Sequence, residues 1–411
     1  MDLATMSVEM KDHLLGTIIP FWRNLRDDEF GGYYGYLSYN LELDKKASKG
    51  CILNSRITWF FSNVYLLYKN GLLSDEDFTR YGYTADDVKK EAMHGFDFLY
   101  NKCIDNENGG IFWSLAYDGT PDDTTKHTYN QAFCIYALSS YYDAVSDGKA
   151  IELAKELVKI IEEKCTDDLG YLEARTITFE PESNEKLSEN GVMADKTMNT
   201  ILHVFEAYSE FYRITRDEFV GKRLEWIMDT FAEKVYNPKL HRQEVFFDRE
   251  YNVIIDLHSY GHDIETAWLM DRGVRILGKK EYEDKMYPIT KDLTDNIFKI
   301  AFDGRSLANE CERGVVNEWR IWWVQAETVL GFLNGYIADN ARTDLLDAAF
   351  AQWNFIKEYV WDKREGSEWY WRIEKDGTPD PSQPIVEPWK CPYHNGRMCI
   401  EVIKRDAGVL V

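Results

Sequence analysis

Apolar residues recur at helical spacing along the whole chain, and stop signals separate them into about twelve predicted helices. The intervening segments are short, and no low-complexity tract or Pro/Gly/Ser-rich linker interrupts the pattern. The predicted helices cover approximately residues 4–22, 52–72, 84–101, 128–146, 148–163, 195–215, 217–235, 262–278, 280–300, 318–338, 340–360 and 392–404.

Two kinds of helix alternate in this series. The predicted helices at 84–101 and 148–163, and every second one after them, carry a charged face. In contrast, residues 51–68 contain a single charge, Arg56, and residues 129–142 contain none. A helix that is apolar all round belongs in an interior, whereas one with a charged stripe belongs outside. A closed ring of alternating inner and outer helices satisfies both patterns, so the sequence predicts an all-α protein, one (α/α)6 barrel domain over residues 1–411.

Short segments rich in glycine and aromatic residues recur between the helix pairs, about 60 to 80 residues apart. Glycine permits tight turns and aromatic residues favour strands, so these segments predict small β-hairpins between the helix pairs. They lie at residues 31–36, 109–113, 170–172, 245–248 and 368–371.

Unusual polar and aromatic residues fall on the helices predicted to form the inner ring. Each has an ordinary structural explanation on its own: a buried ion pair for an arginine, a core hydrogen bond for a histidine, packing for a tryptophan. Burying several polar groups on one axis is costly without a purpose, so their convergence favours a functional cavity. The residues are Arg56, Asn199, His203, Glu206, His262, Glu265, Trp268, Trp323, Glu327 and His394.

The densest of these groups is the stretch 257–265, which contains His258, His262 and Glu265. If a helix begins near Gly261, His262 and Glu265 share one face of it. The spacing also resembles a set of metal ligands. However, Ser259 and Gly261 predict that the helix begins after His258, which places the two histidines on different elements. Inner carboxylates would also suit a glycoside hydrolase, although that chemistry does not need three inner histidines.

Composition narrows the class of partner. The formal net charge of −23 argues against nucleic acid or an anionic membrane surface and is compatible with a neutral ligand. The sequence contains no uninterrupted run of 18 apolar residues, so we expect no membrane-spanning helix, and the N-terminus lacks the features of a signal peptide. Seven cysteines without a Cys-x-x-Cys pair suggest reduced thiols. We therefore expect a cytoplasmic protein, and a monomer, since nothing in the sequence demands an oligomer.

At the candidate residues the sequence resembles a known family. The segments 196–203, 259–265, 322–327 and 389–397 resemble motifs of the cellobiose 2-epimerases, which belong to the N-acylglucosamine 2-epimerase superfamily of (α/α)6 barrels. Residues 55–56 and 126–129 also match, so the resemblance covers nearly the whole chain. It implies that the active-site set is Arg56, Tyr129, Asn199, His203, His262, Glu265, Trp268, Trp323, Glu327, Trp389 and His394.

The reaction implied by this resemblance inverts C2 of the reducing-end glucose in a β-1,4-linked disaccharide, with no metal or nucleotide cofactor. His262 and His394 are the expected proton-transfer groups, because imidazole can act as acid or base near neutral pH. His203 and Arg56 would donate to the oxyanion of an enediolate. Glu265 would orient His262 or a sugar hydroxyl.

The other members of the set are expected to bind the disaccharide, through hydrogen bonds or by stacking on sugar faces. They are Tyr129, Asn199, Trp268, Trp323, Glu327 and Trp389. Two other functions stay open on the sequence: a monosaccharide isomerase or epimerase on the same scaffold, and a carbohydrate-binding barrel without catalysis. The preferred disaccharide is also left open.

Overall fold

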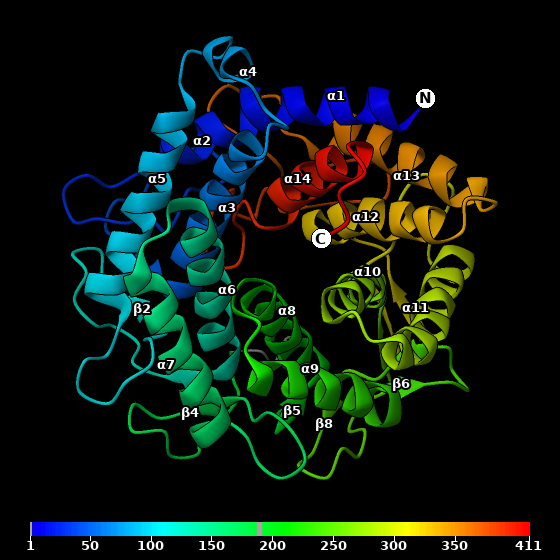
Figure 1. The fold of residues 1–411 in the computed structure, drawn as a ribbon. Coiled ribbons are helices and arrows are strands. Elements are labelled where there is room, and N and C mark those ends of the chain that lie inside the picture. The colour runs from blue at the N-terminus through cyan, green and yellow to red at the C-terminus, as the bar shows by residue number, and fades with distance from the viewer. Residues whose placement is uncertain (1, 187–190) are drawn as a thin grey trace.

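The computed structural model describes residues 2–186 and 191–411, and within these ranges the helices form two concentric rings (Figure 1). Each inner helix contacts the next along the chain, and α14 contacts α3, which closes the ring. This arrangement confirms the (α/α)6 barrel. The inner helices are α3 (Cys51–Lys69), α6 (Thr128–Val145), α8 (Met198–Thr215), α10 (Tyr260–Leu277), α12 (Trp322–Ala338) and α14 (His394–Asp406).

The outer helices pack against the inner ring in the order that the charge pattern predicts. The helix α1 (Leu3–His13) packs on α14, and each of the others packs on the inner helix that precedes it. Several of these outer helices continue into a π-helical turn. These turns are η1 (Leu14–Ile18), η2 (Leu99–Cys103), η3 (Phe231–Val235) and η4 (Ile356–Val360). The remaining outer helices are α5 (Ala85–Phe98), α7 (Gly148–Lys164), α9 (Glu218–Thr230), α11 (Lys280–Ile300) and α13 (Thr343–Phe355).

Three details differ from the sequence prediction. The predicted helix 4–22 is divided into α1, η1 and α2 (Ile19–Arg23). A short helix, α4 (Asp75–Thr79), was not expected, and it is held by a capping box in which Ser74 and Asp77 exchange hydrogen bonds. The helix predicted at 318–338 begins only at Trp322, because the residues before it form the strands β11 (Val315–Asn317) and β12 (Arg320–Ile321).

Short strands tie the N-terminal ends of the inner helices to one another. A strand stands directly before each of five inner helices in the described ranges, and it pairs antiparallel with a strand from the loop before the next inner helix. The pairs are β1 (Lys49–Gly50) with β2 (Ser114–Leu115), β3 (Lys126–His127) with β4 (Ala174–Arg175), β5 (Lys196–Thr197) with β8 (Phe246–Phe247), β9 (Leu257–Ser259) with β10 (Glu310–Glu312), and β12 with β13 (Arg372–Ile373).

Several of the segments rich in glycine and aromatic residues do not form the hairpins expected from the sequence. The predicted hairpins at 31–36, 109–113 and 170–172 are each reduced to one bridge, because a turn closes there after the outer helix. Gly31 and Gly109 adopt positive φ angles of 84° and 82° in two of these turns. Two hairpins occur elsewhere in the described ranges, β6 (Tyr236–Asn237) with β7 (Arg242–Gln243) and β10 with β11.

An ion pair with a buried basic side chain recurs at the same place in several repeats. An aspartate after the outer helix accepts backbone N–H groups two and three residues ahead, and its second oxygen pairs with a basic residue in the strand before the next inner helix. The Lys126 Nζ atom, for example, lies 2.8 Å from Asp105 Oδ2. These pairs hold the turn against the strand, and they are Asp27–Lys49, Asp105–Lys126, Asp167–Lys196 and Asp303–Arg320.

In the described ranges, no helix is both long enough and apolar enough to cross a membrane.

Candidate active site

A cavity of about 470 Å³ lies at the end of the barrel where the inner helices begin. Its inner part is lined by side chains from the first two turns of those helices. Its outer part is lined by the β10–β11 hairpin and by residues next to β12 and β13. The lining residues are Arg56, Tyr129, Asn199, His203, Ser259, His262, Glu265, Asn309, Glu310, Asn317, Trp319, Ile321, Trp322, Trp323, Trp371, Arg372, Trp389 and His394.

The position of the cavity has an electrostatic consequence. The N-terminal end of a helix carries a partial positive charge from its unpaired backbone N–H groups. Several inner helices direct this end toward the cavity, since their preceding strands hold all of them at the same end of the barrel. The cavity is therefore suited to a ligand or an intermediate that develops negative charge.

The imidazoles of His203, His262 and His394 share one arrangement in this cavity. Each Nδ1 atom is held by a protein oxygen: Glu206 Oε2 at 2.9 Å for His203, Ser259 Oγ at 2.7 Å for His262 and Glu327 Oε1 at 2.7 Å for His394. Within residues 2–186 and 191–411, the Nε2 atoms have no hydrogen-bond partner. All three rings therefore offer Nε2 to a ligand in the cavity.

Burial keeps these imidazoles neutral. It lowers the pKa of His262 to about 3, with a smaller contribution from His203. It also places the pKa of His394 well below its usual range, where Arg397 and Arg56 add repulsion. A neutral ring that donates Nδ1–H to a carboxylate has its lone pair on Nε2. His394 is thus held as a base toward the cavity, and the same tautomer of His203 would accept, not donate, a hydrogen bond there.

Arg56 supplies a permanent positive charge to the same space. Its Nη2 atom donates to the Tyr129 hydroxyl at 2.7 Å, and the guanidinium carbon lies 4.1 Å from the centre of the Phe133 ring. A second nitrogen lies 3.4 Å from the Trp389 carbonyl oxygen. These contacts orient the guanidinium, whose side chain is buried and lines the cavity. Since neutral His203 does not donate at Nε2, Arg56 is the stronger candidate for an oxyanion donor.

Aromatic side chains shape the two parts of the cavity. The Trp323 ring lies against both His262 and His394, with its centre 4.7 Å from the centre of the first imidazole and 5.5 Å from that of the second. The Trp389 ring contacts Tyr129 from the side, at 5.8 Å between ring centres. At the outer part, the Arg372 guanidinium stacks at 4.4 Å on Trp319. Flat apolar faces of this kind suit the carbon faces of sugar rings.

Comparison with known proteins identifies the family. The sequence model of the N-acylglucosamine 2-epimerase family matches residues 32–396. The chain belongs to this family. A cellobiose 2-epimerase of Ruminococcus albus is 46% identical over 404 residues, which cover 98% of this chain and 100% of that protein. A cellobiose 2-epimerase of Eubacterium cellulosolvens is 48% identical over 94% of this chain and 95% of that protein.

A solved structure agrees with these relatives. The crystal structure of a sugar epimerase from a ruminal bacterium superposes with a TM-score of 0.92 and 47% sequence identity, covering 97% of this chain and 99% of that one. The structure of this epimerase-family chain also brings together most of the residues expected from sequence. Those that line the cavity are Arg56, Tyr129, Asn199, His203, His262, Glu265, Trp323, Trp389 and His394.

Trp268 and Glu327 lie behind the cavity wall, which corrects the expectation that they bind the sugar. Trp268 is 1% exposed, and its indole donates to Glu327 Oε2 at 2.8 Å. Glu327 is fully buried and uses its other oxygen for His394. These residues lie one helical turn below the cavity-lining positions of α10 and α12, so their side chains reach the interior. Trp268 supports Glu327, and Glu327 orients His394.

Glu265 also has a different partner from the one expected. It does not orient His262, which is held by Ser259. Instead, Glu265 Oε1 accepts a hydrogen bond from Arg397 at 2.5 Å and lies 3.9 Å from His394 Nδ1. Burial, with Glu327 nearby, raises the pKa of Glu265 to about 8. Glu265 is therefore a protonated acid over much of the neutral range and remains available to a sugar hydroxyl.

The metal-ligand alternative at 258–265 is not supported by the geometry. His258 lies in β9, before α10 begins, and its Nε2 atom bonds to Asp263 Oδ2 at 2.7 Å. In the part of the chain that the structure describes, Glu265, Glu327 and His394 come within 4.8 Å of one another. However, the Arg397 guanidinium donates to both of these carboxylates, at 2.5 and 2.7 Å, and a metal ion would have to displace it.

Some residues of the site were not selected from sequence. Ser259, Tyr393 and Arg397 all fall in the segments that resemble the family, yet a serine, a tyrosine and an arginine carry no spacing signal of their own. Arg397 had one usable signal, because it is a charged residue in the first turn of the inner helix that begins with His394. The outer residues Glu310, Trp319 and Arg372 had none, since Trp319 fell in the helix predicted at 318–338 and the other two lay outside every predicted helix and hairpin.

Proposed function

We propose that this chain is a cellobiose 2-epimerase, which interconverts glucose and mannose at the reducing end of β-1,4-linked disaccharides. Cellobiose would become glucosyl-mannose, and lactose would become epilactose. The observation that carries the proposal is the set of neutral imidazoles whose Nε2 atoms open into one cavity beside an arginine. Family membership and identities of 46% and 48% to proteins of that name support it.

The chemistry begins with ring opening, because the C2 proton is acidic only when C1 is a carbonyl. His394 Nε2 takes the O1 hydroxyl proton, a water molecule protonates O5, and the C1–O5 bond breaks. His262, whose imidazole is still neutral, then removes the C2 proton, and the electron pair of that bond becomes the C1–C2 double bond of an enediolate. The negative charge moves to O1, which faces Arg56.

Inversion follows when the intermediate rotates about C2–C3 and another imidazole returns a proton to the opposite face of C2. Ring closure moves the proton held by the first imidazole to O1 and returns the O5 proton to the hydroxide left by the water molecule, so all protons balance. His262 and His394 fit the two proton-transfer roles, since both contact Trp323 and both keep Nε2 free. Glu327 can stabilise the imidazolium of His394 during the cycle.

The outer part of the cavity favours a disaccharide over the monosaccharide alternative. A space of about 470 Å³ exceeds what one sugar ring needs and falls in the usual range for small-molecule sites. Trp319, Trp371 and Arg372 line it beyond the imidazoles, where a second sugar would lie. A binding protein without catalysis would not need three oriented imidazoles.

Incubation with cellobiose, lactose, glucose and N-acetylglucosamine, followed by NMR of the reducing-end sugar, tests this function. We expect epimerisation of the two disaccharides and little of the monosaccharides. Faster turnover of a monosaccharide would support the isomerase alternative, and binding without turnover would support the non-catalytic one.

Replacement of Arg56 tests the oxyanion role. We expect Arg56→Met to lower kcat by about 10²–10³-fold, which corresponds to about 2.7–4 kcal/mol of transition-state stabilisation. Tyr129→Phe is the matched control, because it removes the partner of Arg56 but leaves the charge, and its effect should be smaller. Steady-state kinetics on cellobiose measure both, and a change in KM with kcat unaffected would contradict the assignment.

We also propose that the protein works as a cytoplasmic monomer on a neutral sugar, without nucleic acid or membrane partners. The net charge of −23 and the unpaired cysteines support this proposal. Light scattering on the purified protein tests the oligomeric state, and a mass of twice 48.2 kDa would contradict the monomer.

A further inference from the structure

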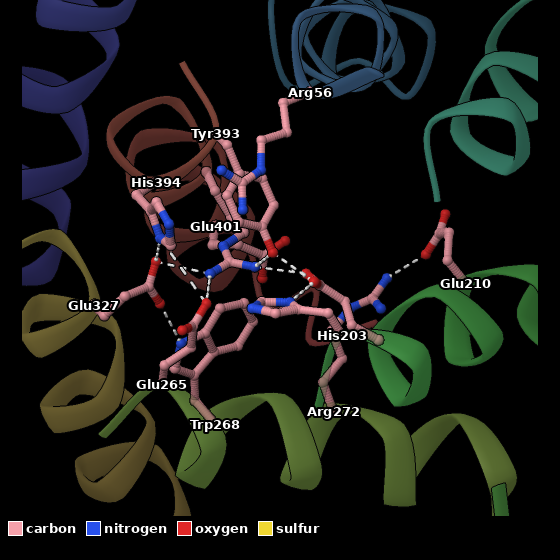
Figure 2. A network of polar contacts seen from close by, with 12 residues as sticks. Arg56, His203, Glu210, Glu265, Trp268, Arg272, Glu327, Tyr393, His394 and Glu401 are labelled. Carbon is pink, nitrogen blue, oxygen red and sulfur yellow. Dashed lines mark hydrogen bonds and ion pairs between the residues drawn. The ribbon is translucent and has the colours of Figure 1, made fainter. Parts of the chain in front are cut away.

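Three buried carboxylates, those of Glu206, Glu265 and Glu327, converge on the guanidinium of Arg397. Figure 2 shows two of them, Glu265 and Glu327, beside His394. The Nη1 atom of Arg397 donates to Glu206 Oε1 at 2.5 Å. The Nη2 atom donates to Glu265 Oε1 at 2.5 Å and to Glu327 Oε1 at 2.7 Å. Arg397 is 1% exposed, and none of these carboxylates is more than 2% exposed. The cluster is therefore shielded from solvent.

The contacts form a continuous path between two of the imidazoles. His203 bonds to Glu206, Glu206 to Arg397, Arg397 to Glu327, and Glu327 to His394. The hydroxyl of Tyr393 bonds to both Glu206 and Arg397, which strengthens the first half of this path. Two aromatic rings pack against the guanidinium, whose carbon lies 4.1 Å from the centre of the Tyr393 ring and 4.8 Å from that of Trp268.

The guanidinium also balances charge that could not otherwise be buried. With Glu265 protonated, the ionised carboxylates of Glu206 and Glu327 carry two negative charges against the one positive charge of Arg397, and an uncompensated buried charge is strongly unfavourable. Although burial opposes ionisation, Arg397 and His203 hold the pKa of Glu206 at about 2. Burial raises the pKa of Glu327, whereas the charge and hydrogen bond of Arg397 and the hydrogen bond from Trp268 oppose this rise and favour the ionised carboxylate.

We propose that Arg397 is a positioning residue for the epimerase reaction: it fixes Glu206 and Glu327, and through them it keeps the Nε2 lone pairs of His203 and His394 directed at the substrate. This inference rests on the proposed function of the cavity. Arg397 itself does not line the cavity, so it acts only through these carboxylates.

Loss of this charge has a predictable effect on His394. With Arg397 removed, one more proton is retained by the cluster at neutral pH, because a nearby cation no longer repels it. If that proton goes to Nε2, the base is lost; if it goes to Glu327, Nδ1 becomes the acceptor and Nε2 carries hydrogen. Both outcomes remove the lone pair. The charged and titratable groups that face His394 are Arg56, His203, Glu206, Glu265, Glu327, Tyr393 and Arg397.

The test compares Arg397→Met with Arg405→Met. Arg405 is also a buried arginine of α14 that pairs with a glutamate, Glu401, and it stacks at 5.3 Å on Trp268, but among the described residues it contacts no imidazole. We expect Arg397→Met to lower kcat on cellobiose at least about tenfold, with a smaller change in KM. The acidic limb of its kcat/KM profile should move up by at least about one pH unit. Arg405→Met should keep the acidic limb of the native protein.

A second variant and a second measurement separate the alternatives. Arg397→Lys keeps the charge but not the forked geometry. We therefore expect it to lower kcat without moving the acidic limb of the kcat/KM profile. This variant also tests the proposal if Arg397→Met does not fold. Titration of His394 by NMR in 15N-histidine-labelled protein reads the same effect without turnover, so it remains informative if cellobiose is not the substrate. An unchanged His394 titration and full kcat in Arg397→Met, or an equal shift in Arg405→Met, would overturn the proposal.

Discussion

Replacement of His262 or His394 by alanine abolishes epimerisation if these imidazoles carry protons on the two faces of C2. General acid–base groups typically contribute 10²–10⁴-fold to a rate, and each substitution removes one of a pair that must act in sequence. We therefore expect kcat on cellobiose to fall by about that factor in either variant. The loss should not be recovered at any pH, since a change in protonation cannot restore the missing imidazole.

Exchange of the C2 hydrogen in heavy water separates the two roles. A variant that retains one imidazole can still remove and return a proton on the face that this imidazole serves, so it should exchange C2 in only one of the two epimers. The matched control is His258→Gln, because His258 is buried near the site but bonds to Asp263 and does not line the cavity. Its kcat should remain close to that of the native protein. Substantial epimerisation by both alanine variants would contradict the assignment.

Replacement of Lys126 by methionine should lower the free energy of unfolding by about 3–5 kcal/mol. Lys126 is fully buried and donates to Asp105 Oδ2 and to the Gly109 carbonyl oxygen, both at 2.8 Å. Burial opposes the ionisation of Asp105, but Lys126 and nearby N–H donors hold the pKa of this carboxyl at about 2. Without the lysine, a charged carboxylate stays in the interior with no counter-charge. Denaturant titration measures the loss.

Two further variants make this prediction specific. Lys90→Met removes the ion pair with Asp86, in which both side chains are more than half exposed, and it should cost under about 1 kcal/mol. Adding Asp105→Asn to Lys126→Met should recover most of the stability, because the amide oxygen can still accept the turn N–H groups without a buried charge. A loss in Lys126→Met no larger than that in Lys90→Met would show that the pair does not hold the repeat together.

The fold could be predicted because its two rings differ in surface chemistry. The nearly charge-free segments at 51–68 and 129–142 could only be interior helices, and they became α3 and α6 of the inner ring. The strands were harder to predict. Their residues pair with partners some 50 to 65 positions away, as Lys49 does with Leu115, and such pairing leaves no local turn signal. The sequence therefore indicated hairpins where the chain makes links between successive repeats.

The sequence predicted which residues belong to the site, but not which of their side chains reach the cavity and which are packed behind its wall. Spacing places a residue on the inner face of a helix, yet it does not show whether the side chain reaches the cavity or the packed interior. Trp323 and Trp268 looked alike in sequence, but the first contacts His262 and His394 in the cavity and the second packs against buried Arg397. Likewise, the partner of His262 is Ser259 and not Glu265, because the turn into α10 directs the serine hydroxyl back onto the ring.

The central claim is that imidazoles on this cavity exchange the C2 hydrogen of a ring-opened disaccharide with solvent. Epimerisation of cellobiose in heavy water, without added cofactor and followed by NMR at C2 of the reducing-end residue, tests it most directly. We predict a mannose-configured product with deuterium at C2. A product that retains the original hydrogen at C2, or no product at all, would contradict the account.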